Sequence, residues 1–182
     1  MQISQITDEP ALVRAAQTDT QAFGALYDRY IQRVFRYCYY RTGSAADAED
    51  ITAQVFLAAL EALPRYRQDG HFAAWLFSIA RKKVADFHRR TPHAMQSLDE
   101  AVLPPVHRDL AVDVETAQCK ERLLQQIQAL AEDERELIHL RYVAELSFAE
   151  IAKTIRKNED AVKKSLYRLI ARLKQELEAE YG

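Results

Sequence analysis

The sequence predicts an all-α protein made of two small helical domains joined by an extended linker. Apolar residues recur at steps of three and four along most of the 182 residues, which is the period of an α-helix. Only four glycines and five prolines occur, so hairpin turns between strands are few. Three of the prolines lie in one aperiodic stretch, which predicts a linker over 92–113.

Four helices are predicted in the first domain, residues 1–91. Their expected spans are 9–17, 21–41, 45–63 and 72–90. Asp8, Asp19 or Thr20, and Ser44 are residue types that cap helix N-termini. Gly43 and Pro64 are expected to end the second and third helices, since glycine favours the C-cap and proline cannot continue a helix.

The second domain is predicted over 114–182, again as helices. The expected spans run from about 114 to 130, from 131 to 143, from 147 to 155, and from the polar break at 156–160 to about 180. Ser147 and Glu150 have the spacing of a capping box at the start of the third of these helices.

The last two helices have the layout of a helix-turn-helix. The residues expected to face inward are Ile151, Ala152, Ile155, Val162, Leu166, Leu169 and Leu173. At about 100° per residue, Lys163, Lys164, Tyr167 and Arg168 then fall on the opposite side, as a DNA recognition helix requires. A helical hairpin with a solvated basic face fits the same spacing, so both interpretations stay open here.

Charge is unevenly distributed, although the net charge of the chain is only −2. Residues 72–90 hold five Lys or Arg against one Asp, and residues 157–174 hold six against two acids. Residues 41–63 instead hold four acids against one Arg. Two basic helices and one acidic helix predict surfaces with different partners.

The helix over 72–90 combines cations with aromatic rings. Phe72, Leu76, Ala80, Val84 and Phe87 form its apolar face, with Ser78, Arg81, Lys82 and Arg89 opposite. Aromatic rings beside cations suit unstacked bases and their phosphates. The alternative is that Trp75 and Phe77 belong to the core and the cations only solubilise the helix.

Several classes of function find no support in the sequence. The five His residues have no metal-ligand spacing, and Cys38 and Cys119 are expected to be plain thiols, so neither a metal nor a cofactor is predicted. No nucleophile–base pair or phosphate-binding loop occurs, so no catalytic residue is expected. The sequence shows no signal peptide and no membrane-spanning apolar run, which predicts a cytoplasmic protein without membrane insertion.

Four stretches of the chain resemble the sigma factors of bacterial RNA polymerase, in the extracytoplasmic-function (ECF) group of the sigma-70 family. Three match the second domain of that family and the fourth matches its helix-turn-helix domain. They read AFGALYDRYIQRVFRYCYYRTG, DAEDITAQVFLAAL, FAAWLFSIARKKVADFHRR and LAEDERELIHLRYVAELSFAEIAKTIRKNEDAVKKSLYRL. Their order and spacing both fit the family.

The resemblance implies three interaction surfaces and no enzymatic activity. In the family the acidic helix docks on the beta-prime clamp of core RNA polymerase, which here implicates Asp47, Glu49, Asp50 and Gln54. The basic–aromatic helix, with the loop at 65–71 before it, holds the melted minus-ten promoter element and a flipped base, which implicates Arg81, Lys82, Arg89 and Arg90. Trp75 is expected to pack the domain instead of stacking a base.

The last helix of the family reads the minus-thirty-five element, which implicates Lys163, Lys164, Tyr167 and Arg168. The implied partners are core RNA polymerase (beta-prime clamp and beta flap), promoter DNA and an anti-sigma factor. A stand-alone helix-turn-helix regulator is the alternative function, but it has no need for the acidic helix. One departure is that Arg156 stands in the turn where the family has Gly, at a cost of about 1 kcal/mol if its φ is positive.

Overall fold

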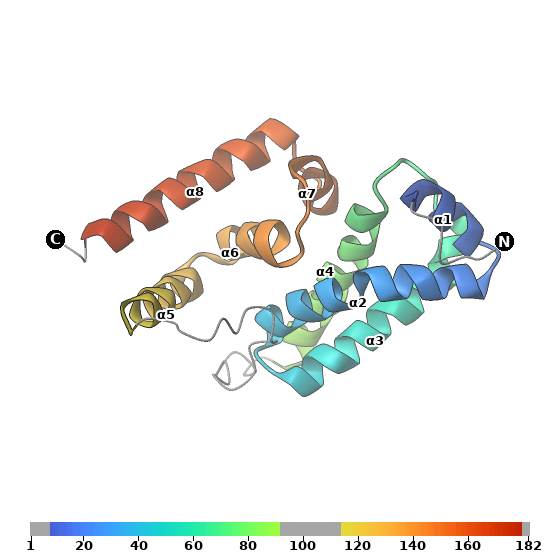
Figure 1. Ribbon diagram of the computed structural model, residues 1–182, viewed down its shortest axis with the longest axis horizontal. Coiled ribbons are helices and arrows are strands. Elements are labelled where there is room, and N and C mark those ends of the chain that lie inside the picture. Colours follow the sequence, from blue (N-terminus) through green and yellow to red (C-terminus); the bar gives the residue numbers. More distant parts are fainter. Residues whose placement is uncertain (1–7, 92–113, 180–182) are drawn as a thin grey trace.

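The computed structural model describes residues 8–91 and 114–179, with side chains described from residue 122 onward in the second range. Every regular element in these ranges is a helix, which confirms the all-α fold class. Residues 92–113, over which the linker is predicted, lie outside the described residues. Figure 1 shows α1–α4 on one side of the molecule and α5–α8 on the other. We call these parts the N-terminal unit (8–91) and the C-terminal unit (114–179).

The helices of the N-terminal unit begin and end close to the predicted positions. They are α1 (Glu9–Ala16), α2 (Thr20–Thr42), α3 (Ala45–Ala62), the short 3₁₀ helix η2 (Leu63–Arg65) and α4 (Phe72–Arg90). Asp8, Asp19 and Ser44 cap α1, α2 and α3 with their side chains, and Gly43 ends α2 with a left-handed φ of 73°. Pro64 stops the α-helical backbone, which continues for one 3₁₀ turn.

The core of the N-terminal unit lies between α2, α3 and α4, with α1 packed on α2. The most completely buried large side chains of this unit are Leu12, Leu26, Tyr30, Tyr37, Tyr39, Leu63, Leu76 and Phe77. On the predicted apolar face of α4, Phe72, Leu76, Ala80 and Val84 are buried and Phe87 is half-buried. The helical period also places Tyr27 of α2 and Leu60 of α3 beside the inner stripes of their helices, but these side chains are 40% and 38% exposed.

The C-terminal unit contains four α-helices and one π-helical segment. They are α5 (Val114–Ala129), α6 (Glu132–Ile138), the π-helix η3 (His139–Val143), α7 (Phe148–Ile155) and α8 (Glu159–Ala179). The single helix predicted over 131–143 thus widens at His139, whose carbonyl accepts from the amide of Ala144 at 2.8 Å. Residues 136–140 are all buried, because the C-terminal unit covers one side of this segment and the N-terminal unit covers the other.

The inner face of the helix-turn-helix agrees with the prediction. Val162, Leu166, Leu169 and Leu173 of α8 are buried, as are Ile151 and Ala152 of α7. The predicted capping box is present, since Ser147 and Glu150 each accept from the other's backbone amide. Within the described residues, none of the helices combines the length and apolar character that crossing a membrane requires.

Candidate polymerase and nucleic-acid interfaces

The acidic face of α3 is exposed and electrostatically unpaired. Asp47, Asp50 and Gln54 recur at helical spacing, so they share one side of the helix, and Asp50 and Gln54 are both exposed. Asp47 is half-buried in the first turn, and exposed Glu49 lies on a different side. Among the residues that the structure describes, no cation forms an ion pair with Asp47, Glu49 or Asp50, so the carboxylates are available to a partner.

An exposed leucine that sequence reasoning did not single out lies on the same face of α3. Leu57 follows Gln54 by three residues and Asp50 by seven, and it is 58% exposed. A large exposed apolar side chain on the same face as acids is typical of a protein-binding surface more than of a solvated one. The seven-residue spacing between Asp50 and Leu57, which places both on one face of the helix, is the signal that could have identified this leucine.

The loop that joins α3 to α4 is held in place by α1. The side-chain amide of Gln17 donates to the carbonyls of Leu63 (3.2 Å) and Tyr66 (2.7 Å). Gln68 in turn donates to the carbonyl of Pro10 at 2.5 Å. Gly70 turns the chain with a φ of 77°, a conformation that glycine adopts without strain. These bonds fix the predicted minus-ten loop although it has no regular secondary structure.

A pocket of about 150 Å³ opens between this loop and α1. It is lined by Glu9, Pro10, Val13, Tyr66, Gln68, Gly70 and Phe72. Aromatic rings, an amide and a carboxylate thus meet in one concave site. Trp75 stands behind it, with its ring centroid 4.7 Å from that of Tyr66 and 5.4 Å from that of Phe72, so it packs the site's wall.

The four candidate cations of α4 do not form a single cluster. Lys82 and Arg89 are exposed and seven residues apart, which places them on one face, and Arg89 also pairs with Asp86. Arg90 is exposed at the end of the helix. Arg81 points elsewhere: its guanidinium lies 3.4 Å from the carboxylate of Glu136 in the C-terminal unit.

The candidate recognition face of α8 is open to solvent. Lys164 and Arg168 are exposed one turn apart, and Tyr167 is 61% exposed beside them. Lys163 pairs with Glu159 at 2.8 Å, a hydrogen bond that raises the pKa of its ammonium and keeps it charged. The rings of Tyr167 and Phe148 lie 5.8 Å apart, which ties this face to α7.

In the turn between α7 and α8, a residue other than glycine adopts a strained left-handed backbone, as the sequence predicts. Arg156 has a left-handed backbone, with φ 56° and ψ 44°. The amide of Lys157 donates to the carbonyl of Ala152 at 2.9 Å, which is the six-to-one bond of a Schellman motif. Asn158 then accepts from the amide of Asp160 at 2.8 Å and caps α8. The helix-turn-helix geometry is therefore kept although one residue has a strained backbone.

Buried titratable groups of the described residues are structural. Burial raises the pKa of the free Cys38 thiol to about 12, so it is protonated and unreactive at neutral pH. Burial also lowers the pKa of His139 to about 3, assisted by Arg41 and Arg135. No group of three or more His, Cys, Asp or Glu side chains in the described part of the chain could hold a metal ion.

Two family models match the chain, one in each unit. Sigma-70 region 2 matches residues 26–92, and Sigma-70 region 4 matches residues 120–173. The first match contains the acidic face of α3 together with the whole of α4. The second contains α6, α7 and the recognition face of α8.

Curated relatives agree with these matches. The chain is 36% identical over 163 residues to the ECF RNA polymerase sigma factor BldN of Streptomyces coelicolor, spanning 88% of this chain and 62% of BldN. It is 32% identical over 183 residues to the ECF RNA polymerase sigma factor SigD of Mycobacterium tuberculosis, spanning 94% of this chain and 84% of SigD.

A solved structure shares the fold. The structure of CnrH in complex with the cytosolic domain of CnrY superposes with a TM-score of 0.69 at 25% identity, covering 94% of this chain and 97% of that chain. Fold, family models and relatives therefore lead to one conclusion. The chain belongs to the sigma-70 family, in the group of ECF RNA polymerase sigma factors.

Proposed function

We propose that this chain is a promoter-specificity subunit of bacterial RNA polymerase, acting in the cytoplasm and without catalytic activity of its own. The single observation that carries the proposal is the unpaired acidic face of α3 on a chain whose α4 and α8 are basic. A stand-alone regulator needs a DNA-reading helix only, whereas a sigma factor also needs a surface for the polymerase.

The polymerase contact that we propose uses Asp47, Asp50, Gln54 and Leu57, with Glu49 at its edge. Exposed carboxylates without internal partners attract a basic surface such as a clamp helix, and they lose no existing ion pair on binding. Leu57 adds an exposed apolar anchor on the C-terminal side of the acids. The beta flap is the proposed partner of the C-terminal unit.

The minus-ten contact that we propose combines the pocket beside the loop with the cations of α4. A flipped base needs a concave site with stacking and polar groups, which Tyr66, Phe72 and Gln68 offer. Lys82, Arg89 and Arg90 are exposed to phosphates of the separated strand. Arg81 is a further candidate once it leaves Glu136.

The minus-thirty-five contact that we propose uses the open face of α8. Lys164 and Arg168 are placed for phosphates, with Lys163 and Tyr167 along the neighbouring ridge of the helix. An anti-sigma factor is the remaining proposed partner. It is supported by the likeness to CnrH, which was solved in complex with the cytosolic domain of a second protein, CnrY.

Co-elution with bacterial core RNA polymerase tests the proposal. The wild-type chain should elute with core enzyme, and Asp50→Arg should weaken that association because it presents a cation to a basic clamp. Glu178→Arg is the matched control, since Glu178 is an exposed acid at the far end of α8. Equal co-elution of both variants would reject the assignment of α3, and no co-elution of the folded wild type would favour the stand-alone regulator.

A further inference from the structure

The pocket beside the loop at 65–71 has a charged group in its wall. Of the described residues that line it, Glu9 alone carries a charge, and the others are apolar, aromatic or neutral. Glu9 is the first residue of α1, and its side chain is 31% exposed. It precedes the match to Sigma-70 region 2, which begins at residue 26. The charge of the pocket is therefore set by a residue that the family model does not cover.

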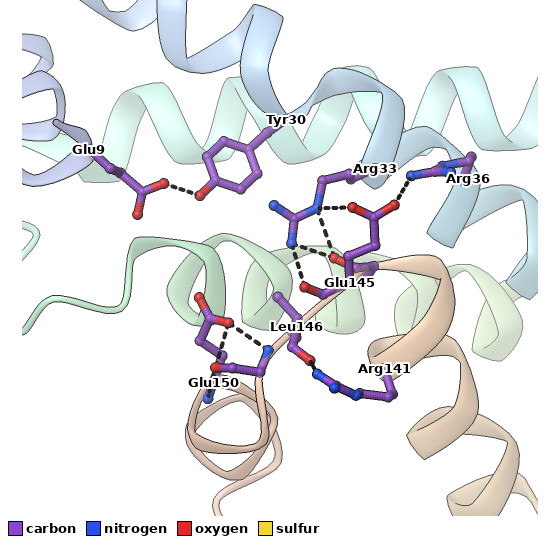
Figure 2. A network of polar contacts seen from close by, with 10 residues as sticks. Glu9, Tyr30, Arg33, Arg36, Arg141, Glu145, Leu146 and Glu150 are labelled. Atoms are coloured by element: carbon purple, nitrogen blue, oxygen red, sulfur yellow. Dashed lines mark hydrogen bonds and ion pairs between the residues drawn. The ribbon is translucent and has the colours of Figure 1, made fainter. Parts of the chain in front are cut away.

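The carboxylate of Glu9 is held by Tyr30 of α2, as Figure 2 shows. The Tyr30 hydroxyl donates to Oε2 of Glu9, and the guanidinium of Arg29 lies 4.0 Å from the same oxygen. Burial, together with this hydrogen bond, raises the pKa of Tyr30, so its hydroxyl stays protonated and donates. The Tyr30 side chain is 2% exposed, and its ring centroid lies 5.5 Å from that of Phe72. Within the described part of the chain, no donor contacts the other oxygen of Glu9, Oε1, which is left for a ligand.

The two walls of the pocket are fixed relative to each other by hydrogen bonds between α1 and the loop. The side-chain amide of Gln17 donates to the carbonyl of Tyr66 at 2.7 Å, and that of Gln68 donates to the carbonyl of Pro10 at 2.5 Å. Glu9 on α1 and the ring of Tyr66 on the loop therefore keep their separation when no ligand is bound. A preformed site of this kind can discriminate between ligands of different shape and polarity.

An ionised carboxylate accepts hydrogen bonds and donates none, so it distinguishes the four bases by their donors. Guanine has two adjacent donors on its Watson–Crick edge, N1–H and the N2 amine. Adenine and cytosine each present one amine beside a ring nitrogen that accepts, and thymine presents one N–H between two carbonyl oxygens. A carboxylate that faces any of these three bases places acceptor against acceptor and leaves polar groups unpaired. Guanine is therefore the base that Glu9 fits.

Three arginines close to the pocket make the site compatible with a polyanionic strand. Arg65 and Arg67 flank Tyr66 in the loop, and Arg14 follows Pro10 by four residues on the same face of α1. All three side chains are exposed, and none forms an ion pair with a described residue. They are therefore available to phosphates next to a base that enters the pocket.

We propose that Glu9 is a specificity-determining residue, and that it makes this pocket select an unpaired guanine of the promoter strand. The carboxylate accepts from N1–H and from the N2 amine of guanine, while the ring of Tyr66 stacks on the base. Oε2 serves Tyr30 and the base together, since each carboxylate oxygen has two lone pairs. The inference rests on the proposed function, because the polymerase supplies the separated strand.

Binding of short fluorescent oligo-dT strands, each with one central guanine, adenine, cytosine or hypoxanthine, tests the proposal on the chain in complex with core RNA polymerase. The wild type should bind the guanine strand roughly tenfold tighter than the adenine and cytosine strands, since a bidentate contact discriminates by about that much. Hypoxanthine keeps N1–H but lacks the N2 amine, so its strand should have an intermediate affinity. Equal affinity for all four strands, or for the guanine and hypoxanthine strands, would overturn the proposal.

Glu9→Gln should move the preference from guanine to adenine, because a glutamine amide accepts from the N6 amine of adenine and donates to its N1. Tyr30 keeps an acceptor in this variant, so α1 stays anchored, and a loss of folding cannot produce a switch of preference. Glu178→Gln is the matched control, which removes the same charge at the far end of α8 and should keep the preference for guanine. A preference for guanine that survives Glu9→Gln would overturn the role of Glu9.

Guanosine monophosphate, added as a competitor, distinguishes a base of the strand from a free nucleotide. It should displace the guanine strand only weakly, because the strand also offers neighbouring phosphates to the arginines. Displacement as effective as that by the unlabelled strand would overturn the assignment to promoter DNA. The proposed function fails separately, if the wild type does not co-elute with core RNA polymerase, and the same strands added to the free chain then test Glu9 alone.

Discussion

The backbone of Arg156 shows how one residue can oppose the local geometry that its position requires. Its φ of 56° is required by the Schellman turn that orients α7 and α8, and its backbone amide donates to the carbonyls of Ala152 and Lys153 in that turn. A Cβ in this region costs on the order of 1 kcal/mol. The structure accepts this cost because the apolar faces of both helices are buried only in this orientation.

Arg156→Gly is expected to raise the free energy of unfolding by about 0.5–1 kcal/mol, since glycine adopts the left-handed region without strain. The greater conformational entropy of glycine in the unfolded chain offsets only part of this gain. Arg156→Ala keeps the Cβ and should change stability little. Urea denaturation of the three chains measures both values. If the glycine variant is no more stable than the alanine variant, the turn is not strained.

His139 is expected to make the fold sensitive to acid. Its pKa is near 3 in the folded chain and 6.5 when unfolded, so below pH 6.5 only the unfolded state takes up the proton. Stability is therefore full above pH 6.5 and falls as the pH drops, by about 2 kcal/mol between pH 7.5 and pH 5.

His139→Gln has no such proton to bind and should lack this part of the pH dependence. Urea midpoints of both chains at pH 7.5 and pH 5 give the comparison. Parallel losses in the two chains would show that other groups, and not His139, account for the acid sensitivity.

At the scale of the elements, each functional helix has one face that builds the core and another that stays available. α8 buries Val162, Leu166 and Leu169, and the same 3.6-residue period places Lys164 and Arg168 outward. α3 follows the same rule with acids in place of cations. The outward faces can therefore change their chemistry without disturbing the fold that positions them.

Lys164→Ala combined with Arg168→Ala is expected to weaken promoter binding by the holoenzyme and to reduce the slope of log affinity against log salt by nearly two. Lys174→Ala, at an exposed site further along α8, is the matched control. Filter binding across a series of salt concentrations provides the slopes. Transcription that survives the double change would remove α8 from the promoter contact.

At the scale of the whole molecule, the two units are coupled through buried polar groups as well as through apolar side chains. Tyr37, Arg41 and Arg81 all contact the carboxylate of Glu136. Removing this carboxylate would therefore take a partner from three side chains of the N-terminal unit. Charge pairs at the rim of the contact, such as Lys153 with Asp69, are half exposed and add little.

Glu136→Ala should therefore lower the free energy of unfolding by about 3 kcal/mol, because it leaves buried guanidinium and hydroxyl groups without their acceptor. Tyr37→Phe removes a single hydrogen bond and should cost only about 1 kcal/mol. Both values come from urea denaturation followed by circular dichroism. Equal effects of the two substitutions would mean that the arginines find other partners.

The helices, their caps and the faces that build each core can be predicted from the sequence, because these features depend on neighbours within about four residues. Asp8, Asp19, Ser44 and the capping box at Ser147 all act as predicted. The left-handed turn at Arg156 was also predictable, since a family pattern with Gly implies the φ that any substitute must adopt.

Other features depend on how the helices pack together in three dimensions. The π-helix at His139, the exposure of Leu57 and Leu60, and the pocket beside the loop depend on which helices happen to pack nearby. The pairing of Arg81 with Glu136 joins residues 55 positions apart, and periodicity carries no information on such contacts. Long-range charge pairing is set by the docking of preformed units, which no local pattern encodes.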